Sequence, residues 1–358
     1  MSDILYFYVY PFVLLMCLLG FSTFIKGAAQ LYLPIALLIV ISTIIVLLLR
    51  DPFAPSDSVN YSWMYEEQKA FWDVFNAYHG DYFFSFTQYL GNLLNLPVSD
   101  FLILHSITFY LITVVGFKLI LKDTRMFIIC LALFSLTSTF VLLYTNVMRQ
   151  GLAMSLLVLS VGLFVRNRFY LGFLFSLLAI FSHFSSLLIV ISILIFRRLN
   201  LSNRTYLMLV VSLPLLSFLS YLILPSIGNF TSRMESLTNQ EYNNNLVYIK
   251  VVIMYLTLLF FYWFMVSERL FNNAMLVLIF KVYFCALGLS FAFLPALLVS
   301  SRYVYYSSVF LPIIYSAFLS IKGNSLNVYV RFFIGLIASI AFGLFVYSFD
   351  STRKQLGI

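Results

Sequence analysis

The chain alternates between long apolar runs and short polar connections over nearly its whole length. Most runs are close to the roughly 20 residues that an α-helix needs to cross the hydrocarbon core of a bilayer. They cover residues 4–24, 31–49, 101–121, 126–145, 150–165, 169–196, 205–225, 246–266, 273–297, 303–321 and 329–349. The pattern predicts an all-α polytopic integral membrane protein with about 11–12 transmembrane helices.

The run 169–196 is too long for one simple span. As a single helix it would be about 42 Å long, and it would place the basic residues after it on the same side as the acidic segment 50–100. A break at His183 gives a short helical hairpin instead, with the basic residues at both ends on the cytoplasmic side. These basic residues are Arg166, Arg168, Arg197, Arg198 and Arg204.

The resulting topology predicts a single integral domain, residues 1–358, with two hydrophilic segments on the outer side, about 50–100 and 226–245. In the first, Trp63 and Trp72 lie among acids, which suits either sugar binding or an aromatic belt at the membrane interface. The apolar but amide-containing stretch from Tyr82 to Leu96 predicts a helix that lies at that interface.

Composition supports the membrane class and limits the chemistry. With 63% hydrophobic and 9% charged residues, the chain has too little polar surface for a soluble protein of its size. The net charge of +8 does not indicate nucleic acid, because the basic residues fall mostly in short loops between apolar runs. The sequence holds no Asp-x-Asp pair, Walker A loop or His-Glu-x-x-His motif. A reaction without metal or cofactor is therefore expected.

Positive charge on the outer side opposes the usual orientation bias and needs a reason. A guanidinium that binds phosphate oxygens bidentately is one such reason, because a lipid diphosphate is a dense anion at the membrane surface. The alternative is an arginine that reaches lipid headgroups or pairs with an acid such as Asp57. The candidate diphosphate-binding residues are Arg149, with Asn146 and Gln150 beside it, Arg233 and Arg302. Lys250, near the outer end of its run, is a candidate for a lipid phosphate.

His183 lies in the sequence Phe181-Ser-His-Phe-Ser-Ser186. Burial keeps an imidazole neutral, and the neutral form accepts protons near pH 7. A lone histidine in an apolar run is more commonly a hydrogen-bonded structural residue, but its position at the break of a long span favours a role as general base.

In order along the chain, four patterns resemble the Wzy-type polysaccharide polymerases, specifically the EpsG-like family. They are Asp57 followed by Tyr61, the helix start Asn146…Arg149-Gln-Gly151, His183 between Phe-Ser and Phe-Ser, and Ser301-Arg302-Tyr303. The family often carries Glu-Pro ahead of the interfacial helix, whereas this chain has Asp81-Tyr82. The family is also similar in architecture to the GT-C-like membrane glycosyltransferases that include the O-antigen ligases.

The resemblance implies polysaccharide biosynthesis, as in O-antigen or lipopolysaccharide assembly, at the periplasmic face of the bacterial inner membrane. A growing glycan would move from undecaprenyl diphosphate onto a new lipid-linked repeat unit. His183 would accept the proton, Arg149 and Arg302 would neutralise the diphosphate, and Arg233 would close over it. Asp57, Tyr61 and Asp81 would contact sugar.

The implied partners are the lipid-linked donor and acceptor, membrane lipids, a chain-length regulator and a flippase. Three other functions remain open from the sequence. An O-antigen ligase would use the same donor but usually carries a larger outer domain. A flippase or transporter predicts inverted repeats and ionisable residues at mid-membrane. A non-catalytic scaffold would not need arginines against the orientation bias.

Overall fold

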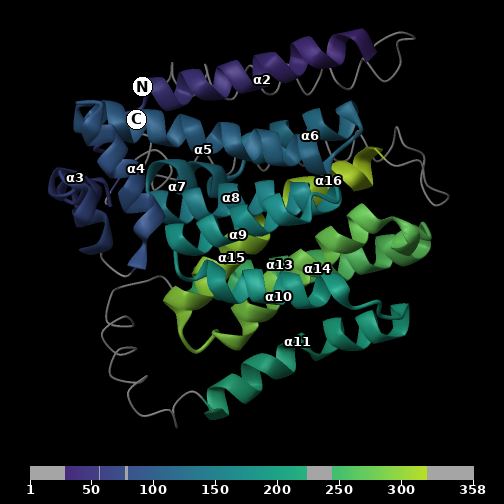
Figure 1. The fold of residues 1–358 in the computed structure, drawn as a ribbon. Helices are drawn as coiled ribbons and strands as arrows, with labels where there is room; N and C mark the ends of the chain where they lie inside the picture. Colours follow the sequence, from purple (N-terminus) through teal and green to yellow (C-terminus); the bar gives the residue numbers. More distant parts are fainter. Residues whose placement is uncertain (1–28, 56, 77–79, 224–243, 321–358) are drawn as a thin grey trace. The chain divides into compact units, whose positions relative to one another are not determined.

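The computed structural model describes residues 29–55, 57–76, 80–223 and 244–320 (Figure 1). These residues form α-helices and short 3-10 helices, with no strand among them. Seven helices in this part of the chain are long and apolar enough to cross a membrane, or up to eight if a bent pair is counted as one span. The protein is therefore a polytopic all-α membrane protein. The seven spans are Tyr32–Leu49, Val98–Ile120, Met148–Val165, Asn203–Ile223, Val247–Ser267, Ala274–Ala292 and Leu297–Ser320.

The predicted run 126–145 is bent within its length. Helix α6 (Thr124–Ser135) ends there and α7 (Ser138–Thr145) begins, and the pair is bent by 70°. The hydroxyl of Thr137 accepts a hydrogen bond from the backbone N–H of Phe140 at 3.1 Å. Such a cap satisfies a donor at the start of a new helix and so favours the break. The predicted runs 4–24 and 329–349 lie outside the described residues.

The run predicted at 303–321 begins earlier and is also interrupted. Helix α15 (Leu297–Ser308) is followed by α16 (Leu311–Ser320), with Pro312 in the first turn of α16. Proline is tolerated in a first helical turn because its missing N–H has no partner there.

The described helices fall into two compact units. Described residues up to Ser186, with those from Tyr315, belong to the first, and Leu187–Ile314 form the second. The prediction of one integral domain stays a prediction.

Helix α8 (Met148–Val165) forms the centre of the first unit, with α5 (Val98–Ile120) and α9 (Phe169–Ser182) packed along it. Helices α5 and α8 approach closely at Gly116 and Gly162. A Cβ atom added to Gly162 would lie 2.8 Å from the carbonyl oxygen of Gly116. Small residues permit this approach between membrane helices. Helix α2 (Ala29–Leu49) runs beside α5 and α6 (Figure 1).

Three short helices connect α2 to α5. They are α3 (Ser58–Glu67), the 3-10 helix η1 (Phe71–Asn76) and α4 (Tyr82–Leu93). The helix predicted from Tyr82 to Leu96 is thus confirmed, three residues shorter. The Tyr65 hydroxyl donates to the Leu96 carbonyl at 2.7 Å, and the Gln88 side-chain amide donates to the Tyr61 carbonyl at 3.3 Å. These bonds fix α3 against α4.

Arg50 lies directly after α2 and binds α5. Its guanidinium is buried and donates to the Ser106 hydroxyl at 2.9 Å and to the Leu102 carbonyl at 3.2 Å. Burial lowers the pKa of Arg50 to about 10, and the nearby negative charge of Asp51 acts in the opposite direction. The cation therefore attaches the end of α2 to α5.

The predicted break of the run 169–196 at His183 is confirmed. Helix α9 ends at Ser182, and α10 (Ser186–Arg198) begins three residues after His183. His183 itself has an extended backbone, with φ −160° and ψ 115°. The hydroxyls of Ser182 and Ser186 donate to the carbonyls of Leu178 and His183, at 2.6 and 2.7 Å. Serine side chains that bond to nearby backbone in this way compete with continuous helix.

The second unit is built around α14 (Ala274–Ala292). Helices α11 (Asn203–Ile223), α13 (Asn244–Ser267) and α15 pack against it, and the 3-10 helix η4 (Leu270–Asn272) joins α13 to it. Lys281 on α14 is buried, and its ammonium donates to the Leu199 carbonyl at 2.7 Å. This contact gives the lysine a structural role at the end of α10.

Candidate active site

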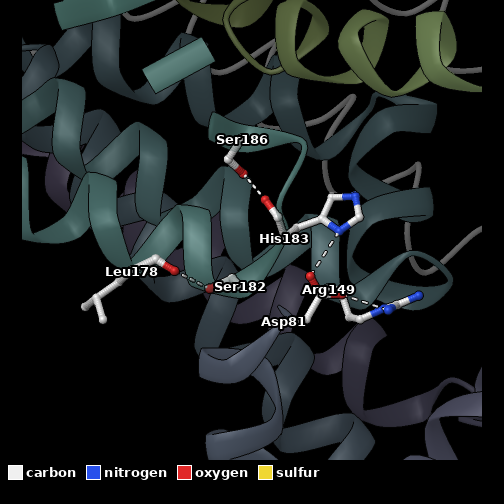
Figure 2. Close-up of polar contacts among 6 residues, drawn as sticks. All are labelled: Asp81, Arg149, Leu178, Ser182, His183 and Ser186. Carbon is white, nitrogen blue, oxygen red and sulfur yellow. Dashed lines mark hydrogen bonds and ion pairs between the residues drawn. The ribbon is translucent and has the colours of Figure 1, made fainter. Parts of the chain in front are cut away.

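A buried carboxylate joins two of the predicted site residues. Asp81 lies directly before α4, and its side chain is only 1% exposed. One oxygen, Oδ2, accepts a hydrogen bond from Arg149 Nη1 at 2.7 Å, and the other, Oδ1, lies 3.7 Å from His183 Nδ1. Figure 2 shows the carboxylate between the guanidinium and the imidazole. Three ionisable side chains from the ends of three helices therefore meet at one point.

The orientation of Asp81 is unusual for its position. An aspartate at a helix N-cap commonly accepts a hydrogen bond from the first backbone N–H groups of that helix. Asp81 makes no such bond to α4. Its two oxygen atoms face Arg149 and His183 instead. The carboxylate therefore contacts the other two members of this cluster of Asp81, Arg149 and His183 and does not cap its own helix.

Arg149 occupies the first turn of α8, and the contact of α8 with α7 fixes its backbone. A Cβ atom on Gly151 would collide with the carbonyl oxygen of Leu143 in α7, which explains the glycine in the Arg-Gln-Gly sequence. A positive charge at a helix N-terminus is disfavoured by the helix dipole. The ion pair with Asp81 offsets that cost and gives Arg149 an acidic partner.

Tyr61 on α3 forms the wall of the cluster beside Arg149. The Arg149 guanidinium carbon lies 6.0 Å from the centroid of the Tyr61 ring, which itself packs against Phe84 of α4. Burial raises the pKa of the Tyr61 phenol to about 12, although the charge and hydrogen bond of Arg149 lower it and the charge of Asp57 raises it further. The phenol is consequently neutral at physiological pH and acts as a dipole in the site.

Asn146 and Gln150 support the start of α8. The side-chain oxygen of Asn146 accepts a hydrogen bond from the backbone N–H of Asp57 at 3.1 Å. Gln150 is buried, with 4% of its surface exposed. The sequence prediction that Asn146 and Gln150 bind substrate stays a prediction, while the contact of Asn146 with Asp57 gives it a structural role between α3 and α8.

His183 approaches the carboxylate from the end of α9. Its side chain is 12% exposed, and its neighbour Phe181 contacts Tyr82 at the start of α4, with 6.4 Å between the ring centroids. Because the chain is extended at His183, the ring leaves the axis of α9 and reaches Asp81. The break that the sequence predicted is therefore what delivers the imidazole to the cluster.

The remaining predicted residues are placed differently. Arg302 on α15 and Lys250 on α13 belong to the second unit, where the Lys250 ammonium lies 5.6 Å from the ring centroid of Tyr305. Arg233 lies outside the described residues. The tryptophans Trp63 and Trp72 are 66% and 73% exposed, a placement that is compatible with both the sugar-binding and the membrane-belt interpretation.

Sequence reasoning missed the central position of Asp81. The prediction that Asp81 contacts sugar stays a prediction, and its side chain is 1% exposed. Two signals were available: an acid directly before a predicted interfacial helix, and the Glu-Pro that the resembled family often carries there. Neither of them relates the acid to Arg149 or His183.

The cluster can hold a proton acceptor and an anion-binding cation side by side. An imidazole near its neutral form accepts a proton from a hydroxyl, and a carboxylate beside it stabilises the cation that results. A guanidinium that is one quarter exposed has donors left for an external anion. Among the described residues, no three His, Cys, Asp or Glu side chains gather as metal ligands would.

Comparison with protein-family models identifies the family of the chain. The model of the EpsG family matches residues 35–356, a stretch that includes α4, α8 and the break at His183. No curated protein and no solved structure matches the chain. Because the family match covers nearly the whole chain, the protein belongs to the EpsG family.

Proposed function

We propose that this protein is a polysaccharide polymerase that joins lipid-linked glycans. Membership of the EpsG family supports a polymerase role. The observation that carries the proposal is the meeting of Asp81, Arg149 and His183 at one point of a membrane protein. Glycosyl transfer from a lipid diphosphate needs a proton acceptor and positive charge near the leaving group, and this cluster contains both.

The donor in the proposed reaction is a growing glycan on undecaprenyl diphosphate, and the acceptor is a new repeat unit on the same lipid. The bond between the anomeric carbon and the diphosphate oxygen breaks, and undecaprenyl diphosphate leaves with the electron pair. A hydroxyl oxygen at the non-reducing end of the acceptor forms the new glycosidic bond. The hydroxyl proton passes to His183, so atoms and charges balance without a redox partner.

Arg149 is the described residue that is best placed to receive the diphosphate. One of its five N–H donors binds Asp81, and the side chain keeps 25% of its surface exposed. The sequence prediction that Arg233 and Arg302 also bind the diphosphate stays a prediction. We place the reaction at the periplasmic face of the bacterial inner membrane, where lipid-linked repeat units would be available.

The test is polymerisation by the purified full-length protein in lipid nanodiscs supplied with undecaprenyl-diphosphate-linked repeat units. The wild type should produce a ladder of lengthening glycans and release undecaprenyl diphosphate, also in excess EDTA. His183→Ala should produce none. Arg204→Ala provides the control, because Arg204 is exposed and lies outside the cluster.

Three outcomes would contradict the proposal. Because the lipid-linked repeat units are supplied directly to the purified protein, no flippase is needed in this assay. If no longer glycans form under these conditions, the protein is not a polymerase. Transfer of the glycan to a lipid A core without chain extension would identify a ligase instead. A requirement for a divalent cation would exclude the metal-independent reaction.

A further inference from the structure

We propose that Asp81 is a positioning residue that holds His183 with its proton on Nδ1, so that Nε2 is the nitrogen that accepts the proton of the acceptor sugar. This inference deepens the proposed function and rests on it. It also gives Asp81 a different role from sugar contact, because the carboxylate acts through the imidazole and not on the substrate.

The carboxylate geometry requires a donor at Oδ1. An ionised carboxylate only accepts hydrogen bonds, and a buried oxygen that accepts none is costly. Oδ1 is buried and accepts no hydrogen bond within the described part of the chain, while His183 Nδ1 lies 3.7 Å from it. This separation is slightly longer than a hydrogen bond, and contacts of this kind tighten when substrate binds.

The donor at Nδ1 determines the chemistry of the rest of the ring. A neutral imidazole carries one N–H and one lone pair. If the N–H is on Nδ1 and faces Asp81, the lone pair is on Nε2, which points away from the carboxylate (Figure 2). The nitrogen bearing the lone pair is the one that can act as a base toward a hydroxyl.

The backbone around His183 keeps the ring in this position. The His183 N–H donates to the Ala179 carbonyl at 3.1 Å, and the His183 carbonyl accepts from the Ser186 hydroxyl at 2.7 Å. Both main-chain polar groups are therefore bonded although the helix ends here. A rigidly held residue loses little entropy when it reaches the reactive geometry.

Arg149 compensates the free-energy cost of burying the Asp81 carboxylate. Burying a carboxylate costs free energy unless a cation and hydrogen bonds compensate it. The 2.7 Å contact between Arg149 Nη1 and Asp81 Oδ2 supplies both. Asp81 is the charged group that faces His183 Nδ1, Arg149 binds the other oxygen of Asp81, and the Tyr61 ring lies beside the arginine.

The tautomer of His183 can be measured directly by NMR. The full-length protein is labelled with ¹⁵N-histidine in nanodiscs, and long-range ¹H–¹⁵N correlations distinguish Nδ1–H from Nε2–H at a pH where the ring is neutral. The chain has three histidines, and His183→Gln identifies the signal of interest. The wild type should show the Nδ1–H form.

Asp81→Asn should reverse that tautomer, because the asparagine amide donates to Nδ1 and moves the ring proton to Nε2. Its kcat in the polymerisation assay should fall by about 10²-fold or more, while the affinity for the lipid donor stays within about threefold. The control is Asp100→Asn, which makes the same change at an exposed carboxylate. Asp100→Asn should leave both the tautomer and the rate unchanged.

The outcomes separate the inference from the proposed function. A wild-type His183 in the Nε2–H form overturns the inference, and this spectrum needs no variant to fold. An unchanged tautomer in a folded Asp81→Asn protein overturns it as well. A correct tautomer in a wild-type protein that makes no polymer contradicts the proposed function while the role of Asp81 in positioning His183 stands.

Discussion

Replacing Gly151 by alanine tests whether the contact between α7 and α8 holds Arg149 in place. The added Cβ atom would collide with the Leu143 carbonyl oxygen and lie 3.1 Å from the Leu143 carbonyl carbon. These are backbone atoms, so no side-chain rotation can relieve the collision. The first turn of α8, which carries Arg149, must therefore move relative to α7.

The expected magnitude follows from two opposing effects. Alanine is favoured over glycine within a helix by about 1 kcal/mol. Overpacking costs about 1–3 kcal/mol, and a rigid backbone neighbour such as Leu143 places this case at the upper end. The net destabilisation is therefore about 2 kcal/mol. Because a shift of about 1 Å in a positioned group can reduce the rate about 10²-fold, polymerisation should fall more than stability alone explains.

Gly288→Ala is the matched control. Gly288 is also helical, in α14, but its added Cβ atom would lie 3.4 Å from Leu213 Cδ2, an ordinary contact with a flexible side chain. This variant should melt at the same temperature as the wild type or slightly higher. The measurements are thermal unfolding in detergent, followed by intrinsic fluorescence, and the length distribution of the glycan product. If Gly151→Ala melts and polymerises like the control, the α7–α8 contact does not position Arg149.

Three further predictions concern the same site. His183→Gln keeps a possible hydrogen bond but cannot accept a proton from a sugar hydroxyl, so the polymerisation rate should fall by about 10²–10⁴-fold, as in His183→Ala. A near-normal amount of glycan product from the Gln variant, measured on a gel, would mean that another group accepts the proton. Arg149→Ala should lower the polymerisation rate at least about tenfold, because a hydrogen bond to a charged group contributes about 1.5–3 kcal/mol. Arg149→Lys should recover only part of the lost rate, since lysine cannot bind bidentately. Full activity of either variant would argue against diphosphate binding. Single cysteines at Phe184 and Asn200 should react with a membrane-impermeant maleimide only from outside and only from inside, respectively, and outside labelling at position 200 would refute the hairpin.

The fold was predictable wherever the run length was decisive. The break at His183 follows from a run that is too long for one span and has basic residues at both ends. The bend at Thr137 was missed because the run 126–145 has the normal length of a span. There the structure depends on a local bond, the cap that Thr137 provides for Phe140, and hydropathy does not report such bonds.

The site was predictable residue by residue but not as an arrangement. Arg149 and His183 were identifiable because ionisable residues are rare in apolar runs, and those that occur there commonly have a function. Their common partner was not identifiable, because Asp81 is 68 residues from Arg149 in the sequence and no helical periodicity relates the two. Only the packing of α4 against α9 brings the carboxylate to the imidazole.

The burial of Asp81 indicates chemistry more than stability. A buried ion pair contributes little net stability, because desolvation of both charges cancels much of their attraction, and well-packed apolar residues often stabilise a protein equally well. The Asp81 side chain is 1% exposed and does not cap its own helix. It binds Arg149 on one side and faces His183 on the other. It has therefore given up a local stabilising bond to make these contacts. The arrangement is therefore better explained by the proton and anion that the three groups handle together than by the fold they help to close.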